Sequence, residues 1–178
     1  PCAVLVSLLP RALPRFRNLV VATSATTRSC RPGEQDGVDY HFMSRADFDA
    51  AVDEGRFLEH VEYAGNRYGT LRSEVDRHLA EGRSVIVEIE LEGARAIRAM
   101  LPDAVTVFIA PPSMEELAER LQRRRTDTES EIAARLEVGR RELAAMAEFD
   151  HRVVNADVDT AAEALADVIL TATEGTAA

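Results

Sequence analysis

The chain has 178 residues, enough for one domain with small inserted lobes, and its 46% apolar content can build a sizeable core. Its net charge of −10 argues against a general binder of nucleic acids or anionic membranes, because both partners require a basic face. All 21 lysine-plus-arginine positions are arginine, so any anion must be held by arginines against a negative overall field.

The first half of the chain alternates short strands, turns and helices. Ser44 is the predicted N-cap of the first helix, with Asp47 at the capping-box position and Gly55 at the helix end. In chain order, we predict a buried strand at 18–25, a turn-rich loop at 31–37, an exposed strand at 38–44, a helix at 45–55, a strand at 56–65, a turn at 66–70 and a helix at 71–82.

The second half of the chain alternates strands and helices more regularly. We predict strands at 84–90, 104–110 and 151–156, and helices at 92–101, 114–124, about 129–148, and 160–173. This order is typical of an α/β fold with three layers and a mostly parallel sheet. The region 31–70 is rich in short strands and turns, which indicates a small antiparallel lobe inserted into that core.

The two cysteines, Cys2 and Cys30, form no disulfide framework and have no metal-ligand spacing. We therefore expect a reduced, cytoplasmic setting and no protein-held metal. No apolar run reaches the roughly 18 residues of a membrane span. We expect neither nucleic acid nor a membrane as a partner, and the sequence indicates no obligate protein partner.

Polar residues gather where strands end, which is where open α/β sheets bind ligands. Guanidinium forks bind phosphate bidentately, and a carboxylate in a pocket suits a base that presents two adjacent N–H donors. Guanine presents such a face, so the set predicts a guanine nucleotide monophosphate. The candidates are Ser24, Arg28, Arg31, Tyr40, Glu59, Tyr68, Thr70, Glu88 and Glu90.

Several candidates also have an ordinary structural interpretation. Arg28 and Arg31 suit solvated loop arginines that pair with Glu34 or Asp36. An exposed strand position suits Glu59, Glu88 and Glu90, and a packing role beside a turn suits Tyr68. The ordered set favours the nucleotide site more than any single residue does.

Several long blocks resemble those of guanylate kinases, in the same order and at the same spacing. They are "SATTRSCRPGEQDGVDYHFMS", "FLEHVEYAGNRYGT", "VIVEIELEGA", "VFIAPPSMEEL" and "FDHRVVNAD", and the similarity runs from about residue 10 to 170. The resemblance implies a single α/β domain over 1–178, with a three-layer P-loop-kinase-like parallel sheet, an inserted GMP-binding lobe at 31–82, and a helical lid with flanking helices at 113–148. It also implies phosphoryl transfer from ATP to GMP, giving ADP and GDP, with ATP as co-substrate and Mg²⁺ bridging its phosphates.

The resemblance assigns roles to matching positions of this chain. Ser24, Glu59 and Thr70 match residues that read the guanine base, and Arg28, Arg31, Tyr40 and Tyr68 match residues that hold the GMP phosphate. Glu90 matches an aspartate near the base and is one methylene longer. Arg124 and Arg135 match catalytic lid arginines that reach the transferred phosphoryl group. The lid sequence here is Arg-Arg-Arg-Thr, without the glycine that is usual in the family. For Arg123 and Arg125, we favour a role as solvated charged residues over a catalytic role. Arg120 equally suits a pair with Glu116 on its own helix.

The start of the chain departs from the family pattern. Family members carry a G-x-x-x-x-G-K-[ST] loop for the ATP phosphates, but that place holds "PCAVLVSLL", which has no glycine. An ungapped alignment puts Ser7 near the Ser/Thr of the loop. Three explanations are open: a truncated or frame-altered product, a natural relative that binds GMP or a peptide without transferring phosphate, or missing elements supplied by another chain. For the given polypeptide we expect weak or absent kinase activity, with GMP binding retained.

Overall fold

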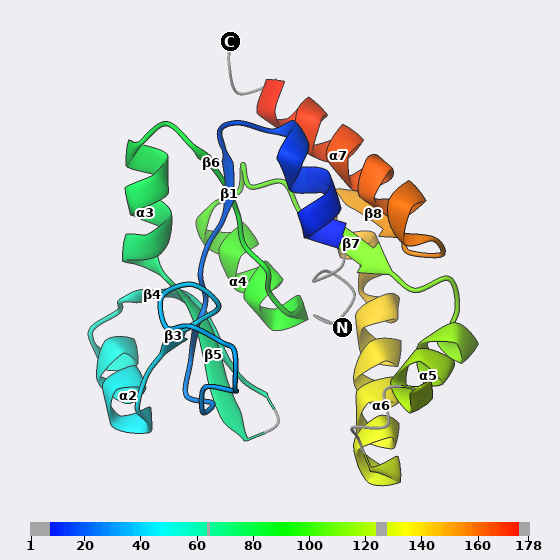
Figure 1. The fold of residues 1–178 in the computed structure, drawn as a ribbon, viewed down its shortest axis with the longest axis horizontal. Helices are drawn as coiled ribbons and strands as arrows, with labels where there is room; N and C mark the ends of the chain where they lie inside the picture. Colours follow the sequence, from blue (N-terminus) through cyan, green and yellow to red (C-terminus); the bar gives the residue numbers. More distant parts are fainter. Residues whose placement is uncertain (1–7, 64, 124–127, 175–178) are drawn as a thin grey trace. The chain divides into compact units, whose positions relative to one another are not determined.

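The computed structural model describes residues 8–63, 65–123 and 128–174 (Figure 1). The chain divides into two compact units. One comprises Phe16–Ala104, and the other comprises Pro1–Arg15 with Val105–Ala178. We call them the central unit and the terminal unit, and each is described by itself.

The central unit contains two small sheets. Strand β1 (Leu19–Val21) pairs in parallel with β6 (Ser84–Ile86). The second sheet has the order β3-β2-β5-β4. Its strands are β3 (His41–Phe42), β2 (Ala25–Thr26), β5 (Asn66–Leu71) and β4 (Phe57–Tyr63). The β2–β3 pair is parallel and the other two pairs are antiparallel, so the sheet is mixed and not purely antiparallel as we expected.

Three helices accompany these sheets: α2 (Arg45–Asp53), α3 (Arg72–Ala80) and α4 (Leu91–Met100). The predicted cap of α2 is confirmed, because the Ser44 hydroxyl accepts a hydrogen bond from the Asp47 backbone N–H at 3.1 Å. Gly55 follows the helix with φ +65°, a conformation that favours glycine. Helix α2 buries Phe48, whose ring stacks on Phe57 of β4 at 4.3 Å between centroids.

The sequence was misleading at three strands. The predicted turn at 66–70 is strand β5, and its Gly69 allows close pairing, since a Cβ there would lie 2.7 Å from the Glu59 carbonyl oxygen. The predicted strand at 18–25 divides between β1 and β2, which lie in different sheets. Strand β6 ends at Ile86, so residues 87–90 form an irregular segment and not the end of a long strand.

The terminal unit contains another parallel pair, β7 (Val107–Ala110) with β8 (His151–Val154). Its helical elements are α5 (Met114–Arg123), α6 (Glu129–Ala144), α7 (Val158–Glu174) and the short 3₁₀ turns η1 (Leu13–Arg15) and η2 (Met146–Glu148), with residues 8–12 also helical. Helix α7 buries a stripe with helical spacing: Ala161, Ala162, Leu165, Ala166 and Ile169.

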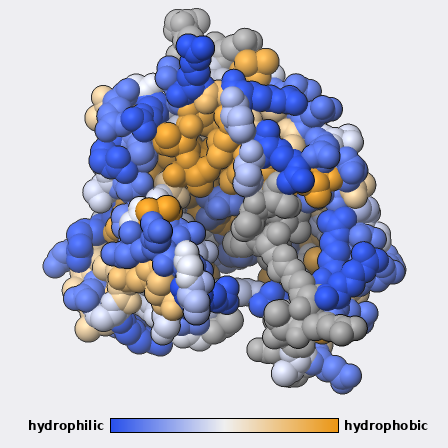
Figure 2. Space-filling view, in the orientation of Figure 1, coloured by the Kyte–Doolittle hydropathy of each residue, from blue (hydrophilic) through white to orange (hydrophobic). Residues whose placement is uncertain are grey.

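The α/β class is confirmed, but the expected continuous parallel sheet is not. Within the described ranges, the parallel strand pairs are β1–β6 and β2–β3 in the central unit and β7–β8 in the terminal unit, and they lie in three separate sheets. Figure 2 shows a mainly hydrophilic face interrupted by apolar areas, an ordinary balance for a folded protein. None of the described helices is long and apolar enough to cross a membrane.

Candidate functional site

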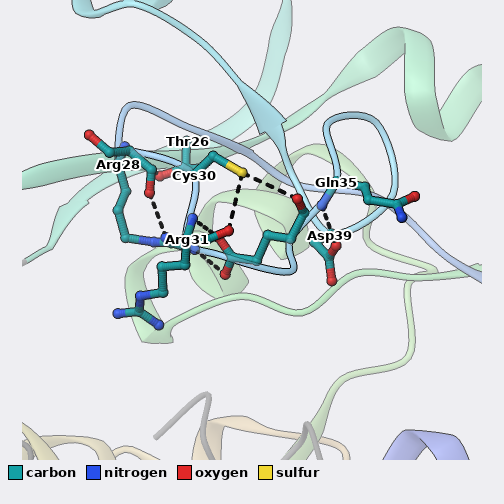
Figure 3. A network of polar contacts seen from close by, with 8 residues as sticks. Thr26, Arg28, Cys30, Arg31, Gln35 and Asp39 are labelled. Atoms are coloured by element: carbon teal, nitrogen blue, oxygen red, sulfur yellow. Dashed lines mark hydrogen bonds and ion pairs between the residues drawn. The ribbon is translucent and has the colours of Figure 1, made fainter.

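Arg28 lies in the loop after β2 (Figure 3). Its side chain forms a two-pronged ion pair with Glu34. Its Nη1 donates to Glu34 Oε2 at 3.0 Å and its Nη2 donates to Glu34 Oε1 at 2.8 Å. The hydrogen bond from Arg28 holds the pKa of Glu34 below its usual value, and the same bond raises the pKa of Arg28. The pairing that we considered as an ordinary interpretation therefore exists.

Arg31 is attached to the same carboxylate through its backbone. Its N–H donates to Glu34 Oε2 at 2.8 Å, and the Glu34 N–H donates to the Arg31 carbonyl at 3.1 Å. Pro32 and Gly33 occupy the middle of this turn, and Gly33 has φ +93°, as a type II turn requires. The Arg31 guanidinium is exposed and points away from the network (Figure 3), and among the described residues none accepts a hydrogen bond from it.

Aromatic rings line the side of Arg28 that faces the sheet. Its guanidinium carbon lies 5.3 Å from the centroid of Tyr40 and 5.7 Å from that of Phe42, within cation–π range. Tyr40 also meets Tyr68 edge-on at 6.2 Å between centroids. Strand β2 explains this convergence, because Thr26 is paired with Phe42 on one side and with Tyr68 on the other.

A buried carboxyl group forms a second part of the candidate site. Glu59 of β4 is only 6% exposed and pairs across the strands with the fully buried Thr70, whose hydroxyl donates to Glu59 Oε1 at 2.7 Å. Burial raises the pKa of Glu59, opposed in part by the Thr70 hydrogen bonds and reinforced by the negative charge of Glu90. Glu59 is therefore not the exposed strand residue that its alternating pattern also allowed.

Helix α4 approaches this carboxyl group closely. A Cβ added at Gly93 would lie 2.8 Å from Glu59 Oε2 and 3.2 Å from the Ile89 Cβ. Glu90 is the N-cap residue of α4, although its side chain forms no capping hydrogen bond. Nearby in sequence, burial raises the pKa of Glu88, and its Oε1 is buried without a hydrogen-bond partner among the described residues.

The structure places most of the predicted residues in the central unit. The eight are Ser24, Arg28, Arg31, Tyr40, Glu59, Tyr68, Thr70 and Glu90. Ser24 lies between β1 and β2, and its carbonyl accepts a hydrogen bond from the His41 N–H at 2.9 Å. Arg28, Tyr40 and Tyr68 are in direct contact, as are Glu59 and Thr70.

The two predicted lid arginines lie outside the sequence range of the central unit. Arg124 lies outside the described residues, and Arg135 is a half-buried residue of α6 in the terminal unit. The neighbouring Arg120 pairs with Glu116 at 2.9 Å, as its spacing predicted, and also donates to the Asn155 carbonyl at 3.0 Å. Arg123 is exposed and pairs with Glu119, in keeping with a solvated charge run.

Sequence reasoning missed two contributors to the site. Glu34 was considered only as an alternative partner, yet it orients Arg28 and fixes the Arg31 turn. The "RPGE" sequence could have indicated this role, because a type II turn brings its fourth residue close to its first. Gly93, in "LEG", was interpreted only as part of a helix, although its lack of a side chain leaves room for the Glu59 carboxyl group.

This arrangement can bind a ligand with an anionic group and a planar polar group. Arg28 uses both Nη atoms for Glu34, and Nη1 also donates to the Ser29 carbonyl, so the Nε side of the guanidinium points in a fixed direction. Arg31 presents an exposed guanidinium. The carboxylate form of Glu59 accepts hydrogen bonds only, and Thr70 already occupies Oε1. Oε2 is not the oxygen bound by the Thr70 hydroxyl and can accept from a donor on a ligand.

Comparisons with known proteins place the chain among related sequences and folds. The sequence model of the family described as guanylate kinase matches residues 5–172. The chain is similar to the guanylate kinase of Synechococcus sp. (strain CC9902), with 50% identity over 159 residues, covering 89% of this chain and 85% of that protein. It is 47% identical over 173 residues to the guanylate kinase of Nocardia farcinica, covering 96% and 90% respectively. The crystal structure of guanylate kinase from Anaplasma phagocytophilum superposes with a TM-score of 0.77 at 30% identity, covering 93% of this chain and 80% of that one.

Proposed function

The chain belongs to the guanylate kinase family, a group of nucleoside monophosphate kinases, and we propose that its central unit binds GMP as phosphoryl acceptor. The observation that carries the proposal is the buried Glu59–Thr70 pair in the same unit as the Arg28, Tyr40 and Tyr68 cluster. The family reaction transfers a phosphoryl group from ATP to GMP and gives ADP and GDP.

Glu59 is the proposed reader of the base. Its Oε2 would accept from the N–H donors on one edge of guanine, and the Thr70 and Ser24 hydroxyls are the proposed further contacts to the base. Adenine lacks this pair of donors and would leave the buried carboxylate unsatisfied, which is unfavourable. Glu90 adds a second negative charge close to Glu59, as its effect on the pKa of Glu59 indicates.

Arg28 and Arg31 are the proposed phosphate ligands. Glu34 and the Tyr40 ring restrict Arg28 to one direction, so less conformational entropy is lost when a phosphate binds. The Tyr40 and Tyr68 hydroxyls are the proposed neutral donors to the same phosphate. The exposed Arg31 guanidinium carries positive charge that would balance the phosphate.

The ATP side of the reaction does not fit the residues present. The 178 residues contain no G-x-x-x-x-G-K-[ST] motif and no lysine, so the usual cradle for the ATP phosphates and Mg²⁺ is not encoded in them. Arg124 and Arg135 are proposed to neutralise charge on the transferred group. We propose that this polypeptide binds GMP and transfers phosphate weakly or not at all.

Titration calorimetry with GMP and AMP tests the acceptor site. We expect GMP to bind and AMP to bind at least about tenfold more weakly, because its base leaves Glu59 without its donors. Arg31→Ala should weaken GMP binding by about tenfold or more, since a charge-assisted contact is lost. Arg45→Ala is the matched control, because Arg45 is exposed and its ion pair with the exposed Glu62 lies at the surface. Equal heats for GMP and AMP, or full affinity in Arg31→Ala, would reject the site.

The missing phosphate-loop motif also favours a second candidate, a non-catalytic interaction module of guanylate-kinase type. In that case the exposed Arg31 guanidinium would bind a phosphorylated protein segment. A phosphopeptide that competes with a captured partner while GMP does not would support this candidate over a nucleotide site.

A further inference from the structure

A buried carboxylate outside the proposed GMP ligands lies on helix α3. Glu74 is 8% exposed, and its neighbour one turn later, His78, is 7% exposed. His78 Nε2 lies 3.2 Å from Glu74 Oε1, and Arg77 Nη2 donates to both Glu74 oxygens at 3.0 Å. A buried carboxylate with several donors fixes the elements from which the donors come.

Two of the groups around Glu74 come from outside its own helix. A hydrogen bond from the Thr23 backbone acts to lower the pKa of Glu74, and His41 Nε2 of β3 lies 3.6 Å from Oε2. His41 Nε2 is buried and has no hydrogen-bond partner among the described residues, and it faces this carboxylate at 3.6 Å. Burial alone would raise the pKa of Glu74, but the hydrogen bonds from Arg77, Thr23 and His78 outweigh it and the pKa is lowered.

The two outside groups belong to the segments that carry proposed GMP ligands. Thr23 precedes Ser24, and His41 follows Tyr40. The His41 backbone N–H donates to the Ser24 carbonyl at 2.9 Å, which closes a ring of contacts through Thr23, Glu74 and His41. Ser24 belongs to the base end of the proposed site and Tyr40 to the phosphate end.

We infer that Glu74 is a positioning residue that sets the spacing between Ser24 and Tyr40 by holding Thr23 and His41 against helix α3. This inference rests on the proposed GMP site and adds a residue that does not itself touch the ligand. A nucleotide must engage both ends at once, so a change in their spacing weakens GMP more than guanosine, which engages the base end alone.

The variants are Glu74→Ala, Glu74→Gln and, as a matched control, Asp76→Ala at an exposed position of the same helix. Calorimetry gives both the dissociation constant and the fraction of competent protein. We expect Glu74→Ala to weaken GMP about tenfold at unchanged stoichiometry, with a smaller loss for guanosine. Glu74→Gln retains an acceptor for the Thr23 N–H and should recover part of the loss, whereas Asp76→Ala should bind as the unmodified chain does.

Amide NMR spectra without ligand provide an independent measurement. Glu74→Ala should shift the resonances of Thr23, Ser24 and His41, and Asp76→Ala should leave them in place. The inference is overturned if Glu74→Ala binds GMP with the original constant, or if GMP and guanosine weaken equally. A fall in stoichiometry with an unchanged constant also overturns it, because that is loss of fold. If the unmodified chain fails to bind GMP, the proposed function fails, and the inference with it.

Discussion

At the scale of single residues, the contact between Arg28 and Glu34 admits two opposite readings. Glu34 could compete with a phosphate for the guanidinium, or it could aim the guanidinium at the phosphate. The geometry favours aiming, because Glu34 binds one N–H of each Nη and does not bind the Nε side. The Tyr40 ring and the Ser29 carbonyl restrain the same side chain further.

Glu34→Ala distinguishes these readings. We expect GMP binding to weaken by about three- to tenfold, because Arg28 and the Arg31 turn both lose their common anchor. Simple competition predicts tighter binding, since one negative charge near the phosphate disappears. Calorimetry in low salt measures the sign, with Glu54→Ala, which removes an exposed ion pair with Arg56, as the control.

Glu59 predicts opposite effects of acid on binding and on stability. Its raised pKa means that the folded protein holds this proton more tightly than the unfolded chain does. Its contribution to stability is therefore present at acidic pH and is lost as pH rises through the raised pKa. GMP affinity should change in the other direction, because only the ionised carboxylate accepts two donors.

The measurement compares the unmodified chain with Glu59→Gln, in GMP affinity and in stability, as pH is varied. At neutral pH the variant should bind GMP more weakly than the unmodified chain, by a factor of about ten or more. The ratio of the affinity of the unmodified chain to that of the variant should approach one as pH falls. The phosphate of GMP titrates near pH 6 in both proteins, so the comparison cancels its effect. A ratio that stays constant across the acidic range would contradict the role of Glu59.

At the scale of elements, the close approach of helix α4 to Glu59 depends on Gly93. Gly93→Ala favours the helix by about 1 kcal/mol, but its Cβ must displace the Glu59 carboxyl group or the Ile89 side chain. We expect near-unchanged thermal stability together with about tenfold weaker GMP binding. Glu92→Ala, at the exposed neighbouring position, should leave binding unchanged. Full affinity in Gly93→Ala would show that the carboxyl group has room to move.

An element could be predicted when the residues that determine it lie within it or next to it in the sequence. The α2 cap was predictable because Ser44, Asp47 and Gly55 act within the helix they delimit. Strand β5 was not, because its Gly69 makes sense only beside the Glu59 backbone of another strand. The shortening of β6 and the separation of β1 from β2 likewise depend on pairing partners that a single sequence does not reveal.

The candidate site was predictable to a similar extent. The resemblance named the residues that converge on Arg28 and on Glu59, and the paired strands account for their convergence. The roles of Glu34, Gly93 and Glu74 were hidden because they act on other protein groups, so no ligand chemistry pointed to them. Residues that hold a site together have a weaker pattern than residues that face the ligand.

At the scale of the whole molecule, the proposed acceptor residues are present while the usual donor motif is not. A coupled assay with ATP, Mg²⁺ and GMP should give turnover orders of magnitude below that of a guanylate kinase with an intact phosphate loop, because contacts made in the transition state are missing. GMP binding measured on the same sample should persist, which separates loss of transfer from loss of fold. Ordinary turnover would contradict the prediction.

The edge-on pair of Tyr40 and Tyr68 also gives the protein an optical property. The chain has three tyrosines and no tryptophan, so tyrosine emission is not masked by energy transfer to an indole. Two of the three emitters form this pair beside the Arg28 guanidinium. An anion that binds their hydroxyls would change the ultraviolet fluorescence of most of the emitting groups at once, so the unlabelled polypeptide carries its own reporter of occupancy.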